Sequence, residues 1–197
     1  MKGGESFAQD AVSLSDAEVL LAEIERLRSQ IATLENRISQ LDRLAHEDSL
    51  VNLPNRRSFV SRLENLIARV ERYGGPAAML FVDLDGLKRI NDKLGHAAGD
   101  QALVQVAQML VASVRKADCV ARIGGDEFGI LLEHADERGA WEMGLRIVET
   151  VVGAEFCVDG VCLPLSVAVG VSAIQTGDDP PAVMARADKE MYRVKAA

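Results

Sequence analysis

The chain has 197 residues, of which 26% are charged and 48% are apolar, and its formal net charge is −8. This composition is ordinary for a globular protein and excludes a disordered chain, and the length leaves room for one sizeable domain plus an accessory element. The acidic balance argues against general nucleic-acid binding, which needs a basic face to neutralise phosphates.

The first segment, residues 1–13, is polar and contains glycine, and we expect a flexible N-terminus there. It lacks the basic region followed by an apolar core that marks a signal peptide. No apolar run elsewhere in the sequence approaches the length of a membrane span. We therefore expect a cytoplasmic protein without membrane contact.

Residues 14–47 are predicted to form a coiled-coil helix. Apolar residues recur there in alternating steps of three and four, at positions that we call the seam: Ala17, Leu20, Ile24, Leu27, Ile31, Leu34, Ile38, Leu41 and Ala45. Isoleucine at heptad position a and leucine at position d favour a parallel two-stranded coil. The flanks agree, since Glu23 can pair with Arg28, and Arg37 with Asp42, across two chains. The alternative is a single amphipathic helix lying on the domain's own surface, which usually has a broader apolar stripe.

Helices and strands alternate over residues 48–197, after Pro54 ends the first helix. The apolar periodicity and the breaker residues predict helices at 56–73, 86–94, 100–115, 138–152 and 181–194. They predict strands at 77–83, 119–123, 127–133, 156–158, 161–163 and 165–174. We expect Asp100 to cap the third of these helices. The order indicates an α+β sandwich in which a central, mostly antiparallel sheet is flanked by helices.

Two of the three cysteines lie in the short hairpin predicted at 156–163. Cys157 and Cys162 flank the turn Asp159-Gly160, so they could face each other across the hairpin. In a reducing cytosol we expect them to be small, buried and reduced instead.

Two acidic features suggest a site. Asp83 ends a wholly apolar strand, and Gly124-Gly125-Asp126 forms a hairpin turn. Alone, the first often marks a strand emerging into solvent and the second is a competent turn. If the two strands are neighbours in the sheet, however, Asp83 lies beside Asp126. Two converging carboxylates repel unless a cation lies between them, and hard oxygen ligands suit Mg²⁺, which also takes phosphate oxygens from a substrate. The glycines would let the backbone approach a nucleotide.

Five motifs follow one another in the chain: Asp48–Arg57, Asp83–Lys88 with Asn91-Asp92, Gly95-His96 with Gly99-Asp100, Arg122–Phe128, and Ala187-Asp188 with Met191-Tyr192 and Lys195. In order and spacing they resemble the GGDEF domain of diguanylate cyclases. The resemblance implies the fold shared with nucleotide cyclases and the polymerase palm, and a reaction that condenses two GTP into cyclic di-GMP and pyrophosphate. Val51-Asn52 replaces the family's usual Thr-Gly, and Leu87 replaces an aromatic residue.

The resemblance also implies a metal site for two Mg²⁺ or Mn²⁺ ions in each active site. Asp83 and Asp126 match its carboxylate ligands, and the carbonyl of Leu84 matches a third ligand. Glu127 matches a residue that either takes the proton of the attacking hydroxyl or helps to bind metal. Two ions there would make the 3′-hydroxyl a better nucleophile and neutralise charge at the α-phosphate.

The substrate-binding positions that the resemblance implies read the guanine base and contact the phosphates: Leu87, Lys88, Asn91, Asp100, Gly124, Gly125 and Lys195. Asn91 and Asp100 match the guanine readers. A carboxylate can accept hydrogen bonds from N1–H and N2–H₂ of guanine, a donor pair that adenine lacks, which favours GTP over ATP. Lys88 and Lys195 match phosphate-contacting lysines, although a lone lysine is usually a solvated surface charge.

Arg115 and Asp118 match the family's product-inhibition motif, because five residues separate Asp118 from Gly124. An Arg and an Asp three apart mean nothing alone. Here Arg115 would bind cyclic di-GMP bidentately while Asp118 pairs with a guanine edge. Arg146 is a further candidate for that site.

A product built from two GTP molecules requires two active sites that face each other, so we expect a homodimer held at high effective concentration by the coiled coil. A regulatory protein that binds the coil is a further expected partner. Two alternatives remain: a sensor that binds cyclic di-GMP with an idle catalytic site, and a dimerising scaffold. Retention of Asp83, Asp126 and Glu127 favours the enzyme.

Overall fold

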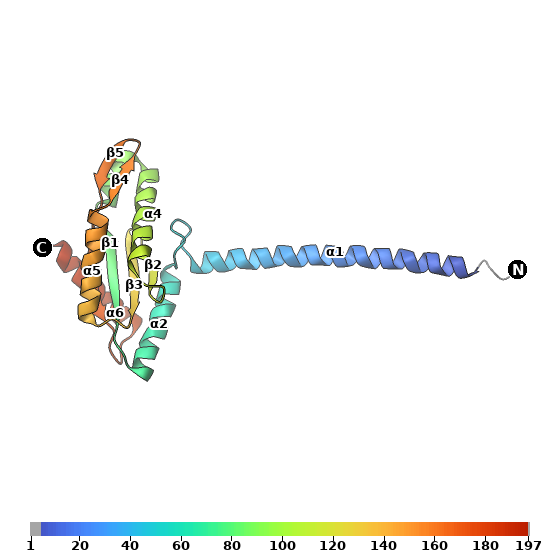
Figure 1. Ribbon diagram of the computed structural model, residues 1–197, viewed down its shortest axis with the longest axis horizontal. Helices are drawn as coiled ribbons and strands as arrows, with labels where there is room; N and C mark the ends of the chain where they lie inside the picture. The colour runs from blue at the N-terminus through green and yellow to red at the C-terminus, as the bar shows by residue number, and fades with distance from the viewer. Residues whose placement is uncertain (1–4, 197) are drawn as a thin grey trace. The chain divides into compact units, whose positions relative to one another are not determined.

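The computed structural model describes the backbone of residues 5–196 and the side chains of residues 19–196, and the chain divides into two units, Met1–Ala45 and His46–Ala197 (Figure 1). The boundary falls at Ala45–His46, close to the expected boundary at residues 47–48. In the described part of the chain, no helix combines the length and the apolarity needed to cross a bilayer.

Helix α1 (Glu5–His46) forms the first unit as far as Ala45. It includes residues 5–13, where we expected a flexible N-terminus. The large side chains of the seam, from Leu20 to Leu41, are 44–65% exposed. Ala17, the first seam position, lies outside the described side chains. The apolar residues of α1 therefore form a stripe that its own unit leaves uncovered.

The second unit contains a four-stranded sheet and a separate hairpin. The sheet has the order β2-β3-β1-β6, with every neighbouring pair antiparallel. Its strands are β1 (Ala77–Leu84), β2 (Cys119–Arg122), β3 (Glu127–Glu133) and β6 (Val167–Ala173). The hairpin pairs β4 (Glu155–Val158) with β5 (Val161–Pro164).

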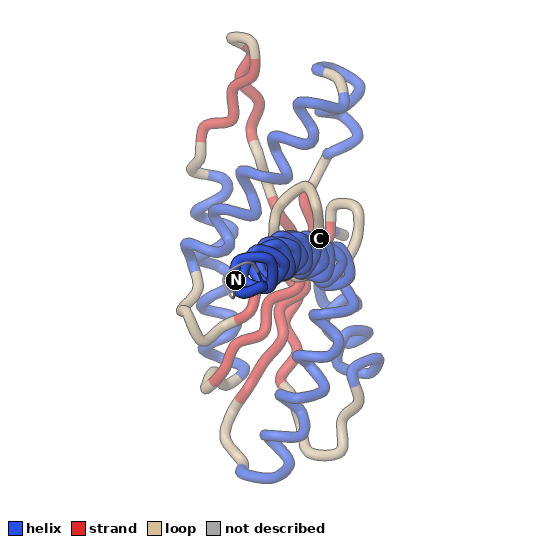
Figure 2. The backbone as a smooth tube through the Cα atoms, turned by 90° about the vertical axis from the view of Figure 1, so that its right-hand side faces the viewer, coloured by secondary structure: helices blue, strands red, loops and turns tan. Residues whose placement is uncertain are grey.

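Helices cover both faces of the sheet (Figure 2). They are α2 (Arg56–Tyr73), α3 (Leu87–Leu94), α4 (His96–Ser113), α5 (Glu137–Val152) and α6 (Pro180–Lys195). Alternate residues of β1 point to opposite faces. Ala78, Leu80 and Val82 belong to the core formed with α3, α4 and α5, whereas Met79 and Phe81 belong to the core formed with α2 and α6. A strand covered on both faces has to be apolar throughout, which confirms the expected α+β sandwich and explains the sequence of β1.

Helix α4 begins earlier than we expected. It starts at His96, directly after Gly95, which has φ +84° and also accommodates the end of α3. Asp100 therefore lies inside the helix, and the prediction that it caps α4 was wrong. The left-handed conformation at Gly95 lets two helices follow each other with a single residue between them. Asp100 is thereby free to point a carboxylate elsewhere.

The hairpin cysteines form a disulfide, Cys157–Cys162, which corrects the expectation of reduced side chains. The two residues are direct partners across β4 and β5, with their Cα atoms 4.0 Å apart. This short separation is typical of a non-hydrogen-bonded antiparallel pair. Both residues are exposed rather than buried. Cys119 is a free thiol.

Candidate active site

The end of β1 and the turn between β2 and β3 meet at one edge of the sheet. Asp83 is the direct antiparallel partner of Glu127, and the backbone N–H of Leu84 donates to the carbonyl oxygen of Asp126 at 2.9 Å. The sequence prediction that Asp83 lies beside Asp126 is confirmed. Three of the four residues expected to surround a metal, Asp83, Leu84 and Glu127, thus lie on two adjacent strands, and the fourth, Asp126, lies in the turn directly before β3.

The carboxylates of this edge, Asp83 and Glu127 among them, repel one another. Asp83 is 8% exposed, and burial raises its pKa, an effect that Lys195 opposes and that Asp126 and Asp85 reinforce. Burial also raises the pKa of Glu127, followed by the charges of Asp83, Asp126 and Asp188, while Arg56 acts in the opposite direction. Additional positive charge would relieve this repulsion.

Lys195, at the end of α6, supplies part of that charge. Its Nζ donates to Oδ1 of Asp83 and lies 3.4 Å from Oδ1 of Asp85. Asp85 also accepts a hydrogen bond from the hydroxyl of Ser166 at 3.0 Å. The sequence suggested Lys195 as a phosphate contact, and in the structure it pairs with the carboxylates of Asp83 and Asp85.

The donor set fits a divalent cation that shares its ligands with a substrate. Among the described residues, no three His, Cys, Asp or Glu side chains are arranged to hold a metal ion by themselves. Asp83 and Asp126 supply hard oxygens at one point, and their mutual repulsion favours a cation between them. Mg²⁺ commonly takes one or two protein carboxylates and completes its shell with water and substrate phosphates.

A cavity of about 500 Å³ adjoins this edge, and most of the expected nucleotide contacts line it. They are Leu87, Lys88, Asn91, Asp100 and Gly125, and the expected metal ligand Asp126 lines the cavity too, whereas Lys195 does not. The structure adds Asp92, His96 and Arg122 to its wall, for which we had no role. Gly124 is not among its lining residues, and the Cβ of any other residue there would lie 2.0 Å from Oε2 of Glu127. Asn91 lies on α3 and Asp100 on α4. Their spacing in the sequence does not show that both side chains line one cavity, and only the family resemblance implied it.

Asn91 has an unusual environment in this cavity. Its Oδ1 is buried and has no hydrogen-bond partner within the described part of the chain. A Cβ atom at Gly99 would lie 1.9 Å from that oxygen. The glycine therefore leaves room for the amide, and the acceptor remains without a donor, which costs free energy in a buried position.

Arg122 connects the cavity to the segment that follows α1. Its Nη1 donates to both carboxylate oxygens of Asp48 at 3.1 Å, and its Nε and Nη2 donate to the carbonyl of Gly125 at 3.2 and 2.7 Å. Asp48 in turn accepts hydrogen bonds from the backbone N–H groups of Leu50 and Val51. Arg122 belongs to the signature motif, but the sequence suggests no role for it. Its partner Asp48 lies far away in the chain, and a contact of this kind leaves no local pattern in the sequence.

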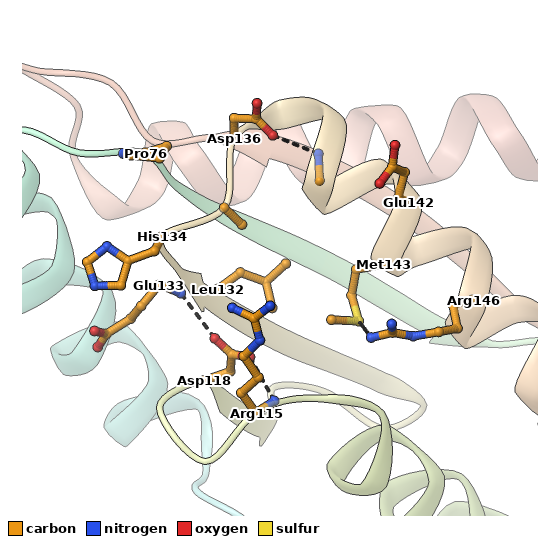
Figure 3. Close-up of a pocket in the computed structure, with 12 residues that line it drawn as sticks. Pro76, Arg115, Asp118, Leu132, Glu133, His134, Asp136, Glu142, Met143 and Arg146 are labelled. Atoms are coloured by element: carbon orange, nitrogen blue, oxygen red, sulfur yellow. Dashed lines mark hydrogen bonds between the residues drawn. The ribbon is translucent and has the colours of Figure 1, made fainter.

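A second cavity, of about 490 Å³, contains the three residues expected at the product-inhibition site. Figure 3 shows that all three line this cavity, with Asp118 beside Arg115 and the guanidinium group of Arg146 next to Met143. Asp118 accepts hydrogen bonds from the backbone N–H groups of Arg115 and Glu133 at 2.9 and 3.2 Å. Arg146 donates to the carbonyl of Ser113 at 3.0 Å. The Asp118 carboxylate therefore also stabilises the backbone conformation of the loop between α4 and β2.

Comparison with protein families and curated proteins finds matches over the whole second unit. The family described as diguanylate cyclase, GGDEF domain, matches residues 45–197. Diguanylate cyclase TpbB of Pseudomonas aeruginosa is 36% identical over 174 residues, which are 87% of this chain and 40% of that protein. Response regulator PleD of Caulobacter vibrioides is 35% identical over 167 residues, 83% of this chain and 37% of that protein. The chain thus spans well under half the length of these relatives.

Solved structures extend the likeness to the helix before the domain. The coiled coil and GGDEF domain of DgcB from Caulobacter crescentus, in complex with c-di-GMP, matches with a TM-score of 0.82 at 26% identity, covering 90% of this chain and 94% of that one. Diguanylate cyclase SiaD from Pseudomonas aeruginosa, in complex with its activator SiaC, matches with a TM-score of 0.74 at 29% identity, covering 98% of this chain and 76% of that one.

Proposed function

Because the chain belongs to the diguanylate cyclase GGDEF-domain family, we propose that it condenses two GTP molecules into cyclic di-GMP and two pyrophosphates. The observation that carries the proposal is the buried, unpartnered Oδ1 of Asn91, in the cavity that Asp100 and Asp126 also line. That oxygen needs a hydrogen-bond donor, and an acidic edge able to hold metal and triphosphate adjoins the same cavity.

Guanine satisfies this cavity better than adenine. Asn91 Oδ1 and the Asp100 carboxylate are acceptors, and guanine offers N1–H and N2–H₂ as donors along one edge. Adenine has an acceptor at N1 and no amino group at C2, so it cannot offer the same pair of donors to Asn91 and Asp100. A site built to accept hydrogen bonds discriminates strongly against a ligand that cannot donate them.

The chemistry takes place at the acidic edge. Asp83, Asp126 and the carbonyl of Leu84 would hold two Mg²⁺ or Mn²⁺ ions, which when bound neutralise charge on the α-phosphate and lower the pKa of the 3′-hydroxyl. The 3′-oxygen of one GTP bonds to the α-phosphorus of the other, whose bond to the bridging oxygen of pyrophosphate breaks. Glu127 accepts the hydroxyl proton, and its raised pKa makes it a stronger base than an ordinary glutamate. The remaining 3′-oxygen then bonds to the remaining α-phosphorus in the same way, which releases the second pyrophosphate and closes the ring.

Lys88 and Lys195 are the proposed partners of the triphosphate. Lys88 is exposed at the wall of the cavity, and Lys195 lies at the acidic edge. Gly125, also exposed there, leaves space for a nucleotide to approach the turn.

Two such domains must meet, because each binds one GTP. We assign this task to the seam, whose exposed stripe fits a second copy of the same helix in a parallel coiled coil. The DgcB structure, which contains a coiled coil and a GGDEF domain, supports this arrangement. A regulatory protein that binds the helix is a further proposed partner, as suggested by the complex of SiaD with its activator SiaC. GTP is a cytoplasmic metabolite, so we place the protein in the cytoplasm.

The decisive experiment incubates the purified protein with GTP and Mg²⁺ and measures cyclic di-GMP. We expect the wild type to form the product. Asp126→Asn should lower the rate at least about a hundredfold, because a negative charge that stabilises the transition state is removed. The matched control Asp159→Asn, in the hairpin turn, should keep the wild-type rate. Binding of cyclic di-GMP without turnover by the wild type would instead support a sensor.

The second cavity supports feedback inhibition by the product, because Arg115, Asp118 and Arg146 offer two guanidinium groups and a carboxylate to a guanine dinucleotide. In Arg115→Ala we expect the inhibitory potency of cyclic di-GMP to fall at least about tenfold while the initial rate stays unchanged. Inhibition curves of the variant and the wild type check this. Equal potency in both would mean that inhibition, if any, arises elsewhere.

A further inference from the structure

Lys195 makes contacts that a phosphate-binding lysine would have to give up. Its ammonium group donates to Oδ1 of Asp83 and lies 3.4 Å from Oδ1 of Asp85. The side chain of Asp83 is 12% exposed and that of Lys195 is 32% exposed. The pair is therefore shielded from solvent on the carboxylate side, where an ion pair is stronger than at a fully exposed surface.

A divalent cation and the Lys195 ammonium compete for the same carboxylate. Metal ligation by Asp83 would place a divalent cation on a carboxylate that already accepts a hydrogen bond from the Lys195 ammonium, and two positive charges on one carboxylate repel each other. Asp85 offers little relief, since it also accepts from Ser166. Among the described residues, Arg193, the other cation of the last turn of α6, pairs with Glu190 and does not reach the carboxylates.

We propose that Lys195 is a built-in counterion that competes with the divalent metal for Asp83 and leaves it only when a triphosphate offers a stronger anionic partner. The lysine then changes partner as metal and nucleotide enter together, so that metal binds weakly without nucleotide. This inference rests on the proposed cyclase function, because it takes a nucleoside triphosphate as the second anion. A long side chain at the end of a helix permits such a change with little movement of the backbone.

The test measures Mn²⁺ affinity by electron paramagnetic resonance in nucleotide-free protein. We expect Lys195→Met to bind Mn²⁺ about tenfold more tightly than the wild type, because the competing charge is gone. Lys195→Arg keeps the charge and should resemble the wild type. Lys189→Met, which removes an exposed lysine from the same helix, is the matched control for net charge and should change nothing. Circular dichroism identifies any variant that does not fold, and the Met and Arg variants provide two independent comparisons.

The same titration is repeated with 3′-deoxy-GTP, which cannot be cyclised. The nucleotide should tighten Mn²⁺ binding much more in the wild type than in Lys195→Met, and Asp83→Asn should abolish the difference between the two. Equal or weaker Mn²⁺ binding by Lys195→Met without nucleotide would overturn the competition. Failure of the cyclase proposal would look different: the wild type would form no cyclic di-GMP, whereas the Mn²⁺ affinities would still separate the lysine variants.

Discussion

The position of the Asn91 amide depends on the absence of a side chain at Gly99. Both residues lie at the cavity proposed for guanine, and the Cβ position of Gly99 coincides with the space occupied by Asn91 Oδ1. A glycine inside α4 would otherwise be a disadvantage, because alanine stabilises a helix interior by roughly 0.5–1 kcal/mol relative to glycine. Its presence within a helix is therefore explained by the neighbouring amide.

Gly99→Ala should accordingly displace the Asn91 amide and raise KM for GTP by about tenfold or more, because the base loses an acceptor that fits it. Steady-state kinetics on the purified variant check this. Gly144→Ala, whose Cβ would meet the side chains of Val169 at 3.1 Å and Leu80 at 3.9 Å, is a control away from the cavity. An unchanged KM in Gly99→Ala would show that the amide can move without loss.

A second residue-scale prediction concerns Asp178, which stabilises α6 against β6. Its carboxylate accepts hydrogen bonds from Arg186 at 2.8 and 2.6 Å, and Arg186 also donates to Ser172 and to the carbonyl of Ala173. The hydrogen bond from Arg186 lowers the pKa of Asp178 below its ordinary value of 3.8, and burial opposes this only partly. A lowered pKa in the folded state contributes stability that is present above the unfolded pKa and is lost as pH falls through the folded one.

Asp178→Asn should therefore reduce the free energy of unfolding by about 1 kcal/mol at pH 7, at the low end for a charged hydrogen bond because Arg186 is partly exposed. At a pH below the folded-state pKa of Asp178 both proteins carry a neutral side chain at this position, and the difference should vanish. Urea denaturation at both pH values measures the difference in the free energy of unfolding between the two proteins. A pH-independent difference would mean that shape, not charge, is responsible.

Among elements, the sheet strands and most helices followed from the sequence, whereas two local features did not. The apolar run of β1 and the breaker residues around α2 predict those elements almost to the residue. The start of α4 was missed because an aspartate is a good cap and Gly95 gives no sign of its φ of +84°. The disulfide was missed because pairing depends on cellular redox conditions, which residue spacing does not report.

Helix α6 brings Lys195 to the acidic edge by packing closely on β6. A Cβ atom at Gly170 would lie 2.1 Å from the carbonyl oxygen of Ala187 and 2.2 Å from the backbone nitrogen of Met191. Both obstacles are backbone atoms, which cannot rotate away. The closeness of the helix to the strand therefore requires glycine at this position.

Gly170→Ala should push α6 away from the sheet and lower the free energy of unfolding by about 3 kcal/mol, a large effect of the kind seen for overpacked cores. Thermal and urea denaturation measure it. Gly144→Ala, which meets a side chain instead of backbone, serves again as the control and should cost far less. Equal losses in the two variants would contradict the special role of the α6 contact.

At the scale of the whole molecule, the heptad pattern predicted a helix, and the structure confirms it. A substitution in the seam tests whether a second copy of this helix packs against it. Leu34→Asp places a charge in the seam, where a coiled coil would bury it, whereas Asn36→Asp places the same charge at an outer heptad position. We expect Leu34→Asp to be monomeric and to lose at least about 90% of cyclase activity at low protein concentration, because encounter of two sites then depends on concentration. Light scattering and rate measurements over a range of protein concentrations check both. A dimeric, active Leu34→Asp protein would assign dimerisation to another surface.

The acids at the sheet edge and the cavity-lining residues Asn91 and Asp100 could be predicted from the sequence, because they lie in short motifs of fixed spacing. The sequence suggests no role for Arg56, Arg122 and Asp188, since each acts on residues distant in sequence: Arg56 and Asp188 on the charge of Glu127, and Arg122 on Asp48. Long-range positioning of this kind becomes visible only when the strands and helices are assembled.

The contacts of Arg122 have a thermodynamic consequence. One guanidinium group joins Asp48, two residues beyond the end of α1, to Gly125 in the wall of the cavity proposed for the nucleotide. Linkage is reciprocal, so a partner that binds residues 46–55 and changes the affinity for GTP by a given factor must itself bind with an affinity that GTP changes by the same factor. The proposed substrate would then be an effector of whatever binds before the domain.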